Sequence, residues 1–574
     1  SEGETDQAPG TQADWPLRPW MLAALLALAG LAVHFVTDPA GADLVPWRAA
    51  LAAALVFGPL AFAFTLDRAR WKEPLVFAGV VALVMAGIAW GVSSAGDRHA
   101  DQAFWVAAGL VAITLALPLF QAGFHRLRWR TAYDRTHFHV WTDAISGAGA
   151  LVFTGVSWLL VVLLAALFSA IDIDIVENVV DEPWFGWTFS GAAFGAALGV
   201  LRNQLKIIGT LQSVVLLVLS ILALPLAVAI AVFLGAVVVS GPSVLWNATD
   251  SATPVLLSIA IGAYVLANAV LRDRDADMVG GAVLKWSGYA LALGVLPLTA
   301  FAAISTGVRI GQHGLSPERL WALCSLIVAV AFGLAYFVDA VLGARGSWRD
   351  RLRASNLRLG LGTALFALFL ALPILNFGAI STSDQLARLK SGAISVEEFD
   401  FSALKWDFGA PGRRALQRLA GSDNEAIAKG ARQAQSQEAR PYRWAGERQA
   451  PESLSITWQG GDDALRSSVE DYLLANRNMC GSEGPCAAIA AGTLPSGDRL
   501  VLVTGGSNPR YLGVAEGGDV TQYYARQGRL VEEPFEIAVD LDEPGREGPP
   551  EAEIRPFEGR QLYVDGKPVG EPFE

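Results

Sequence analysis

The sequence predicts an all-α polytopic membrane bundle of about eleven transmembrane helices, with the N-terminus in and the C-terminus out, followed by a small extracytoplasmic α+β domain. The chain of 574 residues is 53% hydrophobic and only 17% charged, with a mean hydropathy of +0.39. Such a composition is too apolar for a soluble protein of this length. The apolar residues also gather in runs that can cross a hydrocarbon core about 30 Å thick.

These apolar runs define the expected spans. They fall near residues 19–37, 46–66, 75–95, 102–121, 146–170, 186–201, 209–239, 252–271, 284–306, 319–343 and 359–377. The sixth run is the shortest, and a re-entrant helix is the alternative there. Gly191, Gly195 and Gly199 recur in it at four-residue spacing, which allows close approach of a neighbouring helix. We therefore expect a buried span.

Basic residues alternate between the loops that separate the runs. One set of loops carries 18 Lys and Arg residues, five of them just before the last run, and the other set carries four. Loops rich in Lys and Arg stay on the cytoplasmic side of a membrane. We therefore expect a cytoplasmic N-terminus, with everything after the last span on the outside.

The sequence divides into four expected parts. They are a disordered cytoplasmic tail (1–18), a transmembrane helical domain (19–378), juxtamembrane amphipathic helices with a linker (379–450) and an extracytoplasmic α+β domain (451–574). In the juxtamembrane part, a short helix is expected from Ser383 to Gly392. From residue 377 onward there are 31 acidic and 21 basic residues, so neither nucleic acid nor an anionic lipid surface is an expected partner of this part.

The C-terminal module is expected to combine one helix with short strands. One helical face, behind the two candidate N-caps Asp462 and Asp463, carries Leu465, Val469, Tyr472 and Leu473. Short β-rich runs cover 499–504, 520–524, 535–541 and 561–564. Cys480 and Cys486 lie close together, and outside the cytoplasm a disulfide between them is expected, with free thiols as the alternative.

One segment after the last run resembles a known family. The sequence Phe-Asp-Phe-Ser-Ala-Leu-Lys-Trp-Asp-Phe-Gly over 399–409, followed by a Gly-Arg-Arg-Ala-Leu helix, is similar to bacterial membrane proteins of the domain of unknown function 4153 family. The basic turn Leu-Arg-Asn-Gln-Leu-Lys over 201–206 is similar too, and the likeness covers about residues 145–420. It implies a protein of the bacterial plasma (inner) membrane and carries over no catalytic residue. In such a membrane, the orientation expected from the loop charges makes the C-terminal domain periplasmic.

Ionisable residues within spans are candidate functional residues because burying them in a membrane is costly. Asp339 lies in the last turns of the tenth run, and His34 lies toward the outer end of the first. If the protein transports a solute, these two residues are the candidate ion carriers. The alternatives are an Asp339 paired with Arg345 and a His34 that lies at the membrane interface.

Two charged clusters in loops are further candidates. Arg202 and Lys206 form a tight cytoplasmic turn that can bind a lipid phosphate or simply anchor the loop. Asp172 and Asp174 alternate on an external connection, where they can bind a divalent cation or form an ordinary solvated loop. The divalent cation is the only cofactor that the sequence indicates.

No motif in the sequence points to an established chemistry. There is no phosphate-binding glycine loop, no HExxH zinc motif and no nucleophile elbow. The leading hypothesis is a non-enzymatic protein of envelope transport or assembly that binds a lipid, a solute or a partner protein through its external domain. The alternatives are an outer-face enzyme acting on a lipid-linked substrate, like the C-type glycosyltransferases, and a structural scaffold of a membrane complex.

Overall fold

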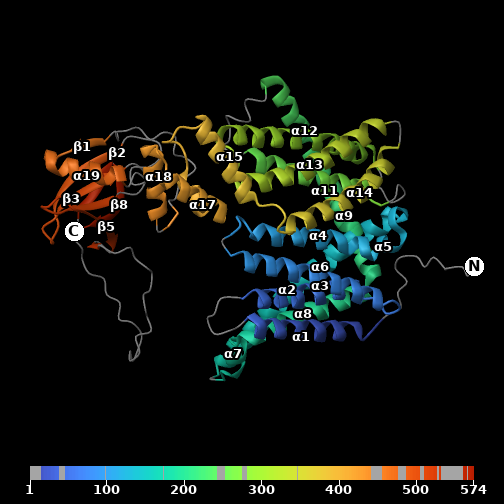
Figure 1. Cartoon of the computed structure of the whole chain (residues 1–574). Helices are drawn as coiled ribbons and strands as arrows, with labels where there is room; N and C mark the ends of the chain where they lie inside the picture. The colour runs from blue at the N-terminus through green and yellow to red at the C-terminus, as the bar shows by residue number, and fades with distance from the viewer. Residues whose placement is uncertain are drawn as a thin grey trace, which may run out of the picture. The chain divides into compact units, whose positions relative to one another are not determined.

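The computed structural model of the chain contains two units, residues 1–440 and residues 441–574 (Figure 1). The structure describes residues 15–37, 45–96, 98–171, 173–241, 252–273, 281–344, 347–437, 439–440, 456–475, 486–504, 510–526, 529–531, 560–564 and 567–573.

Eleven helices of the first unit are long and apolar enough to cross a membrane, among the residues described. They are α1 (Arg18–Thr37), α2 (Pro46–Thr65), α3 (Lys72–Ala95), α4 (Ala103–Gln121), α6 (Tyr133–Ser169), α8 (Pro183–Asn203), α9 (Leu205–Ser240), α11 (Ala252–Leu271), α12 (Ala282–His313), α13 (Pro317–Leu342) and α14 (Trp348–Ala371). Each corresponds to one predicted run, so the prediction of a multi-pass helical bundle is confirmed. Short helices α5 (Phe124–Leu127) and α7 (Ile175–Val180) and a 3₁₀ turn (Arg128–Arg130) lie between them.

Helix α8 corresponds to the uncertain sixth run. Its 21 residues extend about 31 Å at 1.5 Å per residue, which is enough for a full crossing. Its glycines lie directly against the backbone of α1: a Cβ on Gly191 would be 2.2 Å from the Leu26 carbonyl oxygen, and one on Gly195 would be 2.3 Å from that of Leu22. The predicted role of these glycines in close helix packing is confirmed.

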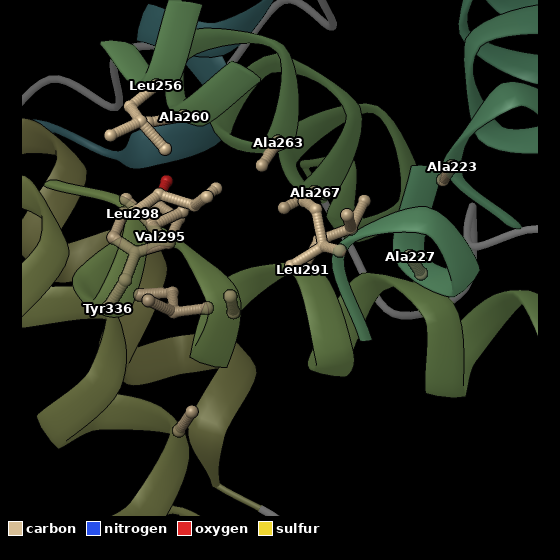
Figure 2. Close-up of a cluster of buried hydrophobic side chains, with 14 of the residues drawn as sticks. Ala223, Ala227, Leu256, Ala260, Ala263, Ala267, Leu291, Val295, Leu298 and Tyr336 are labelled. Carbon is tan, nitrogen blue, oxygen red and sulfur yellow. The ribbon is translucent and has the colours of Figure 1, made fainter. Parts of the chain in front are cut away.

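The largest apolar core of the bundle lies among α9, α11, α12, α13 and α14. Figure 2 shows Leu291, Val295 and Leu298 of α12 beside the alanine-rich face of α11, with Tyr336 of α13 next to them. Small alanines on α11 allow the larger side chains of α12 to fill the space between the two helices. A second core joins α2, α3 and α4 to α13, α14 and α15 (Phe377–Ser391).

The last helix of the bundle, α14, differs in both of its ends from the span predicted at 359–377. The helix begins at Trp348 rather than near residue 359, so Arg349, Arg351 and Arg353 lie on the helix itself and not in a loop. It ends at Ala371 because Leu372 precedes Pro373 and takes an extended conformation. Helix α15 then starts at Phe377, six residues before the expected Ser383.

The N-cap of α15 is Asn376, whose side-chain oxygen accepts a hydrogen bond from the Ala379 amide at 2.9 Å. The expected end of this helix at Gly392 is confirmed, since Gly392 takes a left-handed conformation with φ +72°.

Three further helices follow: α16 (Phe401–Trp406), α17 (Gly409–Ala420) and α18 (Glu425–Ser436). Phe399, Phe401, Leu404 and Phe408, from the segment that carries the family resemblance, are buried in a small core with these helices. The three phenylalanines of this segment therefore stabilise the packing of helices α15–α18, whereas Trp406 of the same segment is exposed.

The second unit contains a small sheet with one helix. Strands β1 (Ile456–Gln459), β2 (Cys486–Thr493), β3 (Arg499–Thr504), β4 (Arg510–Val514), β5 (Val520–Arg526) and β6 (Arg529–Val531) form one sheet in sequence order, and β7 (Arg560–Val564) pairs with β8 (Lys567–Phe573). Among the described strand pairs, only β1–β2 is parallel, and α19 (Asp463–Ala475) lies between these two strands in the sequence. Leu465, Val469 and Leu473 pack on the sheet as predicted, and Asp462 accepts from the Leu465 amide as the predicted N-cap. The expected strand at 535–541 lies outside the described residues.

Candidate functional site

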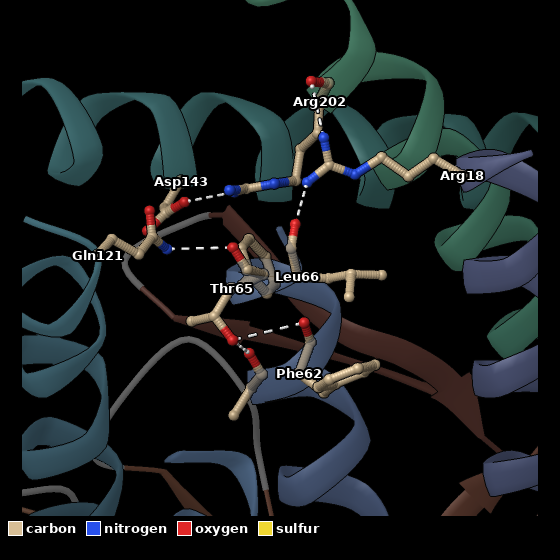
Figure 3. Close-up of polar contacts among 9 residues, drawn as sticks. Arg18, Phe62, Thr65, Leu66, Gln121, Asp143 and Arg202 are labelled. Atoms are coloured by element: carbon tan, nitrogen blue, oxygen red, sulfur yellow. Dashed lines mark hydrogen bonds and ion pairs between the residues drawn. The ribbon is translucent and has the colours of Figure 1, made fainter. Parts of the chain in front are cut away.

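Two arginines and one aspartate form a buried cluster where α1, α6 and α8 meet (Figure 3). Arg202 Nη1 donates to Asp143 Oδ1 at 2.8 Å, and the two side chains are only 9% and 11% exposed. Gln121 Nε2 donates to the other carboxylate oxygen, also at 2.8 Å. Both oxygens of the buried carboxylate therefore have a partner.

The cluster also satisfies carbonyl groups at the ends of two helices. Arg18 donates to the Leu66 carbonyl at the end of α2 (2.7 Å) and to the Arg202 carbonyl in α8 (3.2 Å). The last four carbonyls of a helix have no partner within the helix, and a partner is especially valuable in or near a membrane. Arg353 acts similarly on α11, since its Nη2 donates to the Leu271 carbonyl at 3.0 Å. Arginines that the sequence shows only as positive loop charges thus act as helix caps.

Arg202 was predicted as a lipid-phosphate ligand, together with Lys206. The structure shows the Arg202 guanidinium buried against Asp143 rather than free at the surface. Lys206 lies in the first turn of α9, and its side chain is outside the described part of the chain. A lipid-phosphate role for this turn stays a prediction.

A second polar cluster links the helices around the largest core. Asn268 Nδ2 donates to the Tyr336 hydroxyl (2.6 Å), which donates to Asn356 Oδ1 (2.7 Å), and Asn356 Nδ2 donates back to Asn268 Oδ1 (2.7 Å). Asn356 Nδ2 also lies 3.3 Å from the Tyr133 hydroxyl of α6. Asn268 thus hydrogen-bonds between helices, and the ring of bonds joins α11, α13 and α14.

The two predicted ion carriers lie at opposite ends of the bundle. Asp339 is in the last turn of α13, where it accepts a hydrogen bond from the Ser355 hydroxyl, and Arg345 is outside the described residues. His34 is buried near the end of α1, with its ring centroid 5.2 Å from that of Phe35. The end of α13 is on the same side as the start of α1, because the first part of α6 is linked to both. Tyr133 contacts Asn356, which bonds to Tyr336 of α13, and Asp143 pairs with Arg202, whose carbonyl accepts from Arg18 of α1. Asp339 and His34 therefore do not form a direct relay.

The predicted metal site and disulfide involve residues that the structure describes only in part. Asp172 lies outside the described residues, and Asp174 is exposed at the start of α7. Among the described residues, no group of three or more His, Cys, Asp or Glu side chains is placed to hold a metal ion. Cys480 is likewise outside the described residues, and Cys486 is the first residue of β2. Cation binding and the disulfide stay predictions.

A groove between α15 and α17 differs from the two buried polar clusters, because its polar groups are accessible to solvent. It is an open concavity with a volume of about 950 Å³, within the usual size range of small-molecule sites. Its lining consists of Ala379, Thr382, Ser383, Leu386, Ala387, Lys390, Pro411, Arg414, Gln417 and Arg418. Lys390, Arg414 and Arg418 are exposed and have no ion-pair partner in the part of the chain that the structure describes. Three unpaired cations thus face one concave surface.

Both walls of this groove are fixed to the rest of the first unit. The opposite side of α15 holds the turn between α12 and α13: Asp384 accepts from the Leu315 amide (2.7 Å), Gln385 donates to the Leu315 carbonyl (3.0 Å) and Arg388 donates to the Gln312 carbonyl (2.7 Å). At the start of α17, the Ala410 amide donates to the Arg98 carbonyl at 3.3 Å. The groove is therefore preformed, as ligand sites usually are.

No protein-family model, curated protein or solved structure matches the chain. The resemblance to the domain of unknown function 4153 family stays a prediction.

Proposed function

We propose that the protein is a non-enzymatic component of envelope transport or assembly in a bacterial plasma membrane, and that it binds a small amphiphilic ligand in the groove between α15 and α17. In this proposal the N-terminus is cytoplasmic, and the groove and the C-terminal unit are extracytoplasmic. The excess of basic residues in alternate loops supports this orientation.

The single observation that carries the proposal is the groove itself. Its volume of about 950 Å³ is large enough for a lipid headgroup with its linker. Helix α15 begins only six residues after the last candidate span ends, which supports a position at the membrane surface. A preformed, partly apolar groove beside a bilayer is suited to capturing an amphiphile from that bilayer.

Filling the groove tests the proposal. Ser383 and Ala387 are small, exposed residues of the lining, so Ser383→Trp with Ala387→Trp should occupy it. The matched control is Ala426→Trp, at an exposed position on α18 outside the groove. Native mass spectrometry of gently extracted protein should detect ligand mass above the 60.9 kDa chain in the wild type and the control.

The double variant should lose that mass while it keeps the thermal stability of the control. A ligand that stays bound to the stable double variant would contradict the proposal, as would a wild type that takes up nothing from a membrane lipid extract.

A further inference from the structure

The groove between α15 and α17 is uncharged where the two helices begin, and its cations lie farther along both helices. Gly378, near the start of α15, lies against the end of the segment before α17: a Cβ on Gly378 would be 2.3 Å from the Phe408 carbonyl oxygen. The two helices therefore begin side by side. Ala379 and Pro411 line the groove at this shared end, whereas Lys390 and Arg418 lie near the opposite ends of their helices.

The distance between the two ends of the groove is similar to the length of a lipid headgroup together with part of one acyl chain. Lys390 is eleven residues after Ala379, so the two positions are about 16 Å apart along the axis of α15. The end with Ala379 follows directly from the last candidate span, and the cationic end is farther along the chain. An amphiphile from the bilayer would thus meet uncharged lining first and cations last.

Favourable interactions with the helix dipoles do not account for the positions of all three groove cations, Lys390, Arg414 and Arg418. Lys390 and Arg418 lie in the last turns of α15 and α17, where positive charge is favourable. Arg414 lies in the middle of α17 and gains no such benefit. All three side chains face one groove, and none has a carboxylate partner among the described residues, so their mutual repulsion favours an anionic ligand. Arg pairs well with phosphate because its planar guanidinium donates two parallel hydrogen bonds.

We infer that the ligand of this groove is an anionic phospholipid whose phosphoryl group contacts Lys390, Arg414 and Arg418 and whose apolar portion lies along Ala379, Leu386 and Pro411. This inference rests on the proposed function, because it requires that the groove binds a ligand. The apolar lining distinguishes an anionic lipid from free phosphate, which would use only the cationic end.

The test is a titration of the full chain in mild detergent with short-chain phosphatidylglycerol, short-chain phosphatidylcholine and inorganic phosphate. Phosphatidylglycerol should bind at least about tenfold more tightly than the other two. Phosphatidylcholine has the same phosphate, but the three cations repel its trimethylammonium group, and inorganic phosphate lacks an apolar portion. Arg414→Glu should remove the preference. The control is Lys429→Glu on α18, which is equally exposed, has no described ion-pair partner and lies outside the groove.

The outcomes separate the inference from the proposed function. Equal binding of the two lipids, or an unchanged preference in Arg414→Glu, would overturn the inference, as would inorganic phosphate binding as tightly as the anionic lipid. In each case the proposed function stands if Ser383→Trp with Ala387→Trp still abolishes ligand binding. If that double variant binds phosphatidylglycerol like the wild type, the groove is not the site and both proposals fall.

Discussion

Asp143 of α6 and Arg202 of α8 form a buried ion pair with a 2.8 Å contact between Oδ1 and Nη1. Among the described residues, neither side chain hydrogen-bonds to a second group of opposite charge. The other contact of Asp143 is with the neutral amide of Gln121. Removing one member of such a pair leaves a buried charge uncompensated, which typically costs about 3–5 kcal/mol.

Asp143→Leu should therefore strongly destabilise the protein, as measured by thermal unfolding in detergent. The matched control is Asp350→Leu: Asp350 also pairs with an arginine, at 3.0 Å to Arg353, but it is 79% exposed. The cost of the control should be below about 1 kcal/mol. Similar effects of the two substitutions would show that the buried pair has no special role.

Gly195 should tolerate no larger side chain, because a Cβ there would lie 2.3 Å from the Leu22 carbonyl oxygen of α1. Gly195→Ala forces α1 and α8 apart, and we expect a loss of roughly 1–3 kcal/mol or more. Gly209→Ala on α9 is the control, since a Cβ there meets nothing within 4 Å. The control should be neutral or slightly stabilising. Equal melting temperatures for the two variants would refute the importance of close packing between α1 and α8.

Asp101, in the loop between α3 and α4, should make stability depend on pH. Burial, Glu318 and Asp407 raise its pKa from 3.8 to about 6. The folded protein therefore holds this proton more tightly than the unfolded chain does. The resulting stabilisation is complete below pH 3.8 and is lost as the pH rises through about 6.

Asp101→Asn removes the charge at every pH. The variant should match the wild type near pH 4 and be more stable than the wild type above pH 6. Thermal unfolding of both proteins from pH 4 to 8 measures this difference. Burial and Arg98 lower the pKa of nearby His99, but His99 is present in both proteins, so its contribution cancels to a first approximation in the comparison. A difference that does not change with pH would contradict the prediction.

Tyr336→Phe should weaken the contacts around the largest core. The substitution removes the hydroxyl that accepts from Asn268 and donates to Asn356, so two buried amide groups lose a partner. We expect a cost of about 1–2 kcal/mol, in the range for hydrogen bonds within membrane bundles. Tyr289→Phe, whose hydroxyl makes a single bond of 3.3 Å to the Ala340 carbonyl, should cost less. The reverse order of stabilities would contradict this assignment.

Hydropathy and glycine spacing were sufficient to predict the spans, because both signals are local in the sequence. The ends of the last span were less predictable: Arg349, Arg351 and Arg353 are polar but helical, so the apolar run underestimates the helix at its start. At its end, the apolar run continued to residue 377, although Pro373 could have indicated the earlier stop.

The polar clusters and the groove depend on contacts between distant segments. Arg18 and Arg202 are 184 residues apart, and nothing near either one indicates the other. The groove combines a face of α15 with a face of α17. The sequence of each helix, taken alone, has only the pattern of an ordinary amphipathic helix. A signal was present in the three- and four-residue spacing of Ala379, Thr382, Ser383, Leu386, Ala387 and Lys390, but the sequence does not show which helix lies opposite.

The close contact between α1 and α8 also constrains how the protein is made. Helix α1 ends at Thr37 and α8 begins at Pro183, so nearly 150 residues are synthesised between them. At a synthesis rate of roughly 5–20 residues per second, about 10–30 s pass between the completion of α1 and the synthesis of α8, whose glycines accommodate the α1 backbone. Throughout that interval Arg18 lacks one of its two carbonyl partners, so early insertion of α1 must rely on α2, on lipid headgroups or on the insertion machinery.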